Sequence, residues 1–245
     1  MRRCVEQRFT SRLLSWAWSQ REEVAVYRKV NVGTEPSGSR LARIARASSV
    51  RLAALSQTKA NAQAGLACDI AMGLGLAAFG KLKYGSGVAL PLASFLAGLL
   101  FFTFVEYAFH RWLFHGAIDA FRQGHNEHHL HPDNDDALPF FAPPIAMLAF
   151  ATLLALLVRV DVAMLFVGGV AVGYACYGLG HTVIHRHRFA LAWPRDWAAR
   201  HHIHHNHPGK NFGVTTALWD AILGTRYARR GRPSSSRGGE RMGEP

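Results

Sequence analysis

The fourteen histidines of this 245-residue chain all fall within residues 110–207, in short clusters beside apolar segments. His110 and His115 form a His-x4-His pair, and His125, His128 and His129 form a His-x2-His-His group. Helical residues three or four apart share a face, so the second group is expected to aim its rings in one direction. The first pair is five apart, roughly 140° around an α-helix. That pair converges only if the helix ends near residue 116, or else its two members serve different metal ions.

A second set of clusters follows about fifty residues later. His181 and His185 form a His-x3-His pair, and His201, His204 and His205 repeat the His-x2-His-His pattern. Both spacings again place rings on a shared helix face. The pattern therefore predicts four groups of imidazoles directed at a common site.

Ten clustered imidazoles are more than one metal ion can bind, because zinc sites normally use about four ligands. Two metal ions with about five imidazoles each would use all ten and leave room for oxygen or water. Imidazole suits iron, zinc, copper and nickel alike, so ligand type leaves the metal open. The alternative is a solvated histidine tract that acts as a pH switch or metal buffer. Such a tract would not need separate clusters spread among apolar segments.

Four apolar segments, 65–80, 86–109, 140–158 and 162–180, predict an all-α integral membrane bundle of about four transmembrane helices. The glycines of the fourth segment should allow close helix approach; these are Gly168, Gly169, Gly173, Gly178 and Gly180.

The basic residues predict the orientation of this bundle. Four spans would place 25 of the 28 Lys and Arg residues on the side that carries all the histidines. The positive-inside rule then assigns a histidine-rich di-metal cap to the cytoplasmic face. Because the charges follow the predicted topology, the net charge of +12 does not indicate nucleic-acid binding. A transmembrane b-type haem protein is also disfavoured, since its paired histidines would lie within the spans.

The chain divides into three predicted regions. Residues 1–64 form a basic N-terminal extension, partly disordered or folded as an amphipathic helix on lipid, or a leader without a role. Residues 65–227 form the membrane domain, and residues 228–245 a disordered basic tail. Three widely separated cysteines imply no disulfide framework.

Four stretches of this chain resemble the fatty acid hydroxylase superfamily, which includes sterol desaturases, sphingolipid and fatty acid hydroxylases, and carotenoid hydroxylase relatives. They are EYAFHRWLFH (106–115), GHNEHHLHPDNDD (124–136), HTVIHRH (181–187) and RHHIHHNHPGKNFGVTTALWDAILGT (200–225). The resemblance covers about residues 65–227. It implies two iron ions, with zinc as a possible substitute. It also implies ten metal ligands: His110, His115, His125, His128, His129, His181, His185, His201, His204 and His205.

The function implied by this resemblance is hydroxylation of an unactivated C–H bond of a lipid, such as a fatty acyl chain or a sterol. The reaction would use O₂ and electrons from an external donor of the b-type cytochrome or ferredoxin type. No catalytic residue is expected beyond the metal ligands. The alternatives are a lipid desaturase, a carotenoid ring hydroxylase, or a non-catalytic membrane protein stabilised by zinc. The oligomeric state stays open.

Several polar residues near the clusters have open roles. Glu106 lies one turn before His110 and either orients a ligand histidine or pairs with Arg111 or Arg122. The remaining histidines are expected outside the ligand set, in a supporting layer or at the surface; they are His131, His187, His202 and His207.

Overall fold

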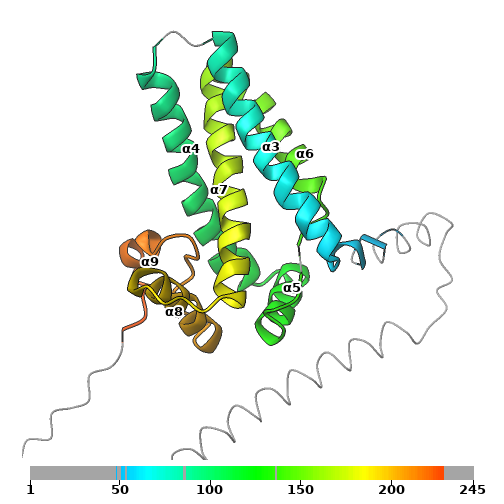
Figure 1. Cartoon of the computed structure of the whole chain (residues 1–245), viewed down its shortest axis with the longest axis vertical. Coiled ribbons are helices and arrows are strands. Elements are labelled where there is room, and N and C mark those ends of the chain that lie inside the picture. The colour runs from blue at the N-terminus through cyan, green and yellow to red at the C-terminus, as the bar shows by residue number, and fades with distance from the viewer. Residues whose placement is uncertain (1–47, 49–50, 53, 85–86, 136, 229–245) are drawn as a thin grey trace, which may run out of the picture. The chain divides into compact units, whose positions relative to one another are not determined.

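The computed structural model describes residues 48, 51–52, 54–84, 87–135 and 137–228, and within them every regular element is a helix. Four helices form an elongated bundle (Figure 1): α3 (Lys59–Tyr84), α4 (Ala89–Ala108), α6 (Ala142–Ala155) and α7 (Val160–Arg186). The shorter helices gather at one end of it: η1 (Phe109–Phe114), α5 (Asp119–Leu130), α8 (Ala192–Asn206) and α9 (Leu218–Ile222). The predicted extension before residue 48 and the tail after residue 228 lie outside the described residues.

Three of the four predicted spans are helices long and apolar enough to cross a membrane. They are Lys59–Lys83, Ala89–Phe114, in which η1 continues α4, and Val160–Arg186. The first begins six residues before the predicted segment 65–80. The predicted span 140–158 contains the 14-residue α6, which is shorter than the roughly 20 residues that a perpendicular crossing needs. The chain is therefore a membrane protein with three membrane-capable helices and one shorter apolar helix among its described residues.

Helix α7 is the centre of the bundle, in contact with α3, α4 and α6. Its glycines permit this, as predicted for three of them. A Cβ on Gly169 would lie 2.1 Å from the carbonyl oxygen of Phe95 in α4. Gly168 likewise faces α3, and Gly173 faces α4. By contrast, Gly178 has open space around it, and Gly180 faces Trp197 of α8. Small residues let backbones approach where the hydrophobic effect gives no driving force between helices.

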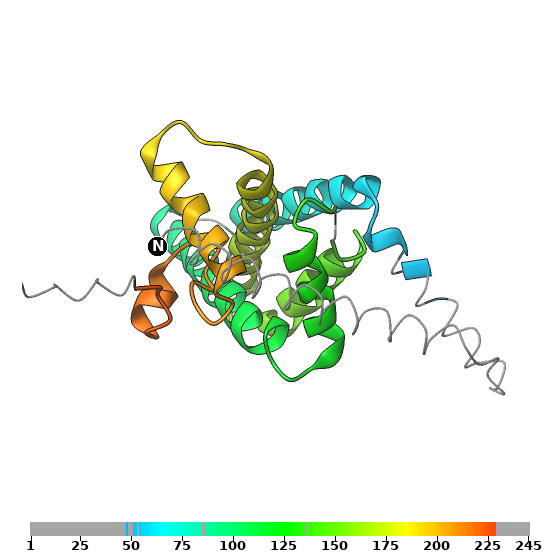
Figure 2. The same ribbon diagram turned by 90° about the horizontal axis from the view of Figure 1, so that it is seen from below.

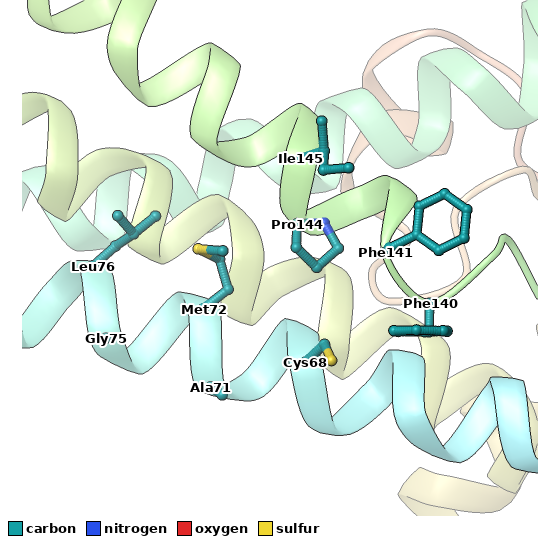
Figure 3. A pocket seen from close by; sticks show the side chains of 9 residues that line it. All are labelled: Cys68, Ala71, Met72, Gly75, Leu76, Phe140, Phe141, Pro144 and Ile145. Carbon is teal, nitrogen blue, oxygen red and sulfur yellow. The ribbon is translucent and has the colours of Figure 1, made fainter.

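An apolar groove of about 570 Å³ separates α3 from the start of α6 (Figure 3). Cys68, Met72 and Leu76 of α3 line one wall, and Phe141 and Ile145 are among the residues of the other. None of the clustered histidines lines this groove, so it is separate from the polar end of the bundle.

Candidate metal centre

The ten predicted ligands form two clusters of five at the polar end of the bundle. Within each cluster, one nitrogen atom from every ring lies within 4.8 Å of the others. The first cluster contains His110, His115, His125, His129 and His204. The second cluster contains His128, His181, His185, His201 and His205. Each cluster could hold one metal ion, and the two are adjacent because the rings of His129 and His205 stack at 4.3 Å.

Helix η1 explains how His110 and His115 reach the same cluster although they are five residues apart. Residues Phe109–Phe114 form a π-helix, and the His115 amide donates to the carbonyl of His110 at 3.2 Å. A hydrogen bond between residues five apart closes a wider turn than that of an α-helix. The two rings therefore lie on the same side, and their centroids are 5.2 Å apart. Of the two predicted arrangements, the structure shows the one in which both join one cluster, with the helix ending at Phe114.

The two His-x2-His-His groups do not aim all their rings one way, contrary to the expectation from spacing. On α5, His125 and His129 join the first cluster, while His128 joins the second. The reason is that neighbouring helical residues differ by about 100° in direction, so His128 and His129 face different clusters.

Helix α8 repeats this division with the clusters exchanged. His201 and His205 join the second cluster, while His204 crosses to the first. Each half of the chain thus supplies four rings to one cluster and one ring to the other.

The spacing of the ring nitrogens fits a bound cation better than it fits hydrogen bonds. In the first cluster the Nε2 atom of His125 is 3.0 Å from the Nε2 atoms of His110, His115 and His129. One ring nitrogen carries at most one proton, so it cannot share hydrogen bonds with three others at once. Metal–imidazole bonds of about 2.1 Å at right angles place two nitrogens about 3.0 Å apart, whereas tetrahedral angles give about 3.4 Å.

The second cluster shows the same arrangement around a different ring. The Nε2 atom of His201 is 2.9–3.0 Å from those of His181, His185 and His205. The fifth ring, His128, has a buried Nε2 atom with no hydrogen-bond partner. A buried nitrogen without a partner is costly, and a metal ion would satisfy it. Both clusters therefore fit a metal ion with near-right-angle geometry and five nitrogen donors.

Burial keeps these rings neutral at physiological pH. It lowers the pKa of His115 and His128 to about 4 and that of His129 to about 3, with smaller contributions from neighbouring histidines. Burial also lowers the pKa of His201 and His205. Removal from water disfavours the charged form. Since metal binding requires the unprotonated nitrogen, the clusters are prepared to accept cations without first losing protons.

The loop between α8 and α9 holds two rings of the first cluster. His110 Nδ1 bonds to the carbonyl of Phe212, and His204 Nδ1 bonds to the carbonyl of Lys210 at 2.8 Å. A carbonyl can only accept, so both Nδ1 atoms carry the proton and both Nε2 atoms are free to bind a metal. The sequence does not reveal these two carbonyls, because a backbone group leaves no signature in residue type.

Glu106 neither contacts a ligand histidine nor pairs with Arg111 or Arg122, which were its two predicted roles. Its carboxylate accepts hydrogen bonds from the amides of Val214 and Thr215 and from the Thr215 hydroxyl. Arg111 instead donates to the Tyr107 hydroxyl at 2.8 Å. Glu106 therefore acts on His110 only through the loop that carries the Phe212 carbonyl.

Asp220 is a second buried carboxylate that sequence reasoning did not single out. Its two oxygens accept the amides of Phe212 and Gly213, each at 2.8 Å, and one also accepts the Thr225 hydroxyl. The signal that could have found it is an acidic residue inside the otherwise apolar stretch ALWDAIL.

The four histidines expected outside the ligand set do lie outside both clusters. All four are exposed; they are His131, His187, His202 and His207. His207 stacks on Tyr227, and His131 faces Glu127 at 3.6 Å.

Comparison with known proteins assigns this architecture to a family. The family model described as fatty acid hydroxylase matches residues 95–225, which include both histidine clusters and the loop that supports them. The chain belongs to the fatty acid hydroxylase family. The resemblance stated from the histidine motifs is confirmed.

Individual relatives agree with this assignment. The chain is 31% identical over 163 residues to the dihydroceramide fatty acyl 2-hydroxylase FAH2 of Arabidopsis thaliana, covering 59% of this chain and 66% of the relative. It is 30% identical to the ceramide very long chain fatty acid hydroxylase scs7 of Schizosaccharomyces pombe, covering 60% of this chain and 46% of the relative. It is 29% identical to the fatty acid 2-hydroxylase of Mus musculus, covering 57% and 41%. The chain thus spans less than two thirds of the length of these relatives.

A solved structure shows the same fold. The chain aligns with full-length scs7p, of which only the hydroxylase domain is visible, with a TM-score of 0.54 and 26% identity. The alignment covers 65% of this chain and 62% of the other.

Proposed function

We propose that this protein is a membrane oxygenase that hydroxylates a fatty acyl chain, with one iron ion in each histidine cluster. The observation that carries the proposal is the pair of five-imidazole clusters at one end of an apolar bundle, in a chain of this family. The relatives reported above are named as fatty acid or ceramide hydroxylases, which supports a fatty acyl substrate.

Bound iron would supply the capacity to activate O₂ against an unactivated C–H bond, which no protein side chain provides. One oxygen atom of O₂ enters the C–H bond, and the other leaves as water with two protons and two electrons from an external donor. A b-type cytochrome or a ferredoxin type of protein is the proposed donor.

The residues of this chain hold and shape the site. The imidazole rings supply ten nitrogen donors. The Phe212 and Lys210 carbonyls fix two of them in the tautomer that presents Nε2. On the side of the bundle, the ring of Tyr177 stacks on His181 at 5.6 Å and Phe102 packs near Tyr177. We propose that the half-buried Tyr177 ring contacts the apolar chain. Phe102, which is buried behind it, helps to exclude water beside the second cluster.

The spacing of the nitrogens also bears on the zinc alternative. Structural zinc is almost always tetrahedral with four ligands. Each cluster offers five donors, and three of them lie about 3.0 Å from the nitrogen of the central ring, His125 or His201. This arrangement favours a metal of higher coordination number, and iron accepts imidazole readily.

The test is to express the full chain in membranes, measure its metal content, and supply a ceramide or a long-chain fatty acid with ¹⁸O₂ and a reducing system. The expected product carries one ¹⁸O atom in its acyl chain, and tandem mass spectrometry of the product tests for position 2. A product that has lost two hydrogen atoms relative to the substrate and carries no ¹⁸O would identify a desaturase. Stoichiometric zinc without O₂ uptake would favour the structural alternative.

We also propose that the histidine clusters face the cytoplasm. The support is the charge distribution, since the four-span topology predicted from the sequence assigns 25 of the 28 Lys and Arg residues to the histidine side.

A further inference from the structure

The two histidine clusters differ in what supports their rings. In the first cluster, His110 and His204 each bond through Nδ1 to a backbone carbonyl. Among the hydrogen bonds of residues 54–84, 87–135 and 137–228, no ring of the second cluster bonds to a carbonyl in this way. The Nδ1 atom of its central ring, His201, is buried and has no partner. Outer hydrogen bonds fix the orientation of a ligand histidine and raise its basicity, so the first cluster is better prepared for a metal ion.

Residues 210–215, here the carbonyl loop, present both of these carbonyls, and two buried carboxylates hold the loop in place. Asp220 is 1% exposed and binds the amides of Phe212 and Gly213. Glu106 is 6% exposed and binds the next two amides, those of Val214 and Thr215. Four consecutive amides thus donate to two carboxylates from different helices, α4 and α9.

The backbone at the centre of the carbonyl loop has little freedom to move. A Cβ on Gly213 would lie 2.0 Å from the carbonyl oxygen of Thr216. Asn211 has a positive φ of 54°, and its side chain donates to the Arg200 carbonyl in α8 and accepts from the amide of Tyr227. The loop is therefore tied to α4, α8 and α9 at once, and its carbonyls hold a fixed position relative to the first cluster.

We propose that Glu106 and Asp220 are positioning residues that make the first cluster the tighter of two inequivalent metal sites. They act through the carbonyl loop on His110 and His204, and the first cluster fills before the second. The inference rests on the proposed function in one respect, namely that both clusters bind metal. Loss of the groups that hydrogen-bond to metal ligands typically weakens metal binding about 10–100-fold. This range sets the expected difference in affinity between the two clusters.

The test is a titration of the full-length protein, stripped of metal and held in detergent, with Co²⁺ against a competing chelator. The visible absorption of the bound Co²⁺ reports on its coordination. We expect two binding steps that differ at least about 10-fold in affinity. His115→Ala should remove the tighter step, and His185→Ala should remove the weaker one. Two equal steps, or loss of the tighter step in His185→Ala, would overturn the inference.

Variants of the two carboxylates test the role of the carbonyl loop separately. Asp220→Asn turns an amide donor towards the loop amides, so the tighter step should weaken about 10–100-fold while the weaker step keeps its affinity. Glu106→Leu should act in the same way. Glu106→Gln should rescue binding, because its oxygen still accepts from the loop amides and its NH₂ group can donate to the Thr215 hydroxyl.

The unchanged weaker step reports in each variant that the protein is folded. If Asp220→Asn and Glu106→Leu leave the tighter step unaltered, or weaken both steps equally, the positioning role is wrong. If the wild-type protein binds no Co²⁺ at all, the proposed metal centre fails as well. That outcome is distinct from two equal steps, which would refute only the inequality of the sites.

Discussion

At the scale of single residues, the clustered histidines can be metal ligands because they are buried without charge. The rings of His201 and His204 are almost fully buried. The lone pairs of several ring nitrogens point towards one place, and a bound cation would give them a partner. The sequence indicated which ten residues would gather, because their spacing and the family motifs mark them. It could not indicate the carbonyls of Phe212 and Lys210, since every residue carries such a group.

Replacing His128 by Ala should reduce the metal content from the proposed two ions per chain to about one, because His128 belongs only to the second cluster. Hydroxylation should fall to background while membrane insertion is unchanged. Metal analysis of the purified protein beside a product assay measures both. His131→Ala is the matched control. His131 is the C-cap of α5, one turn after His128, but its ring is exposed and lies outside both clusters. Full metal content and turnover in His128→Ala would contradict the ligand assignment.

Metal retention should extend to unusually low pH. Protons compete with the metal for ring nitrogens, and ordinary histidines begin to be protonated near pH 6.5. In the folded protein the pKa of His115 and His128 is lowered to about 4, so protonation of these ligands requires a further fall of more than two pH units. Dialysis against a weak chelator at stepped pH should show release only below about pH 5. A release midpoint near 6.5 would count against burial as the controlling factor.

At the scale of elements, the π-helix and the divided His-x2-His-His groups show what spacing alone leaves undecided. Spacing predicts which residues share a helix face under α-helical geometry. The wide turn of η1 changes that geometry for His110 and His115, and spacing rules that assume 3.6 residues per turn do not predict it. The assignment of His128 and His204 to the opposite clusters depends equally on the relative placement of α5 and α8.

The contact between α4 and α7 should tolerate no added methyl group at Gly98. A Cβ there would lie 1.9 Å from the carbonyl oxygen of Phe166, and backbone cannot yield as a flexible side chain can. We expect Gly98→Ala to destabilise the protein by about 1–3 kcal/mol, as in other overpacked sites. Thermal unfolding in detergent measures the change.

Gly75→Ala provides the control for this substitution. Gly75 is also within a membrane helix, but nothing lies within 4 Å of a Cβ placed there. Removing glycine from a helix should then be neutral or stabilise by up to about 1 kcal/mol. Equal melting temperatures for the two variants would show that the α4–α7 contact is looser than described.

At the scale of the whole molecule, the ten clustered rings come from η1 and the residue after it, from α5, from the end of α7 and from α8. The short helices gather at one end of the bundle, which Figure 2 shows from below. The all-helical architecture and this convergence were predictable from apolar segment lengths and from the parity of the crossings. The number of full-length spans was not, because α6 is apolar throughout but ends at Ala155, short of the predicted boundary.

The orientation can be tested with single cysteines in a chain whose three native cysteines are replaced. Gln123→Cys lies on α5 at the histidine end, and Val158→Cys lies in the connection between α6 and α7 at the other end. A membrane-impermeant thiol reagent applied to intact cells should label Val158→Cys only. Labelling of Gln123→Cys without lysis would place the histidines on the outer face and refute the charge argument.

The exchange of one ring between the two halves of the chain has a consequence for biogenesis. The segment from η1 to α5 supplies His110, His115, His125 and His129, yet their fifth partner, His204, is made 75 residues after His129. A ribosome must therefore synthesise nearly the entire membrane domain before either cluster has its full set of five rings. Under the proposed function, iron insertion is a late event in maturation, and each bound ion then links the early and late parts of the polypeptide.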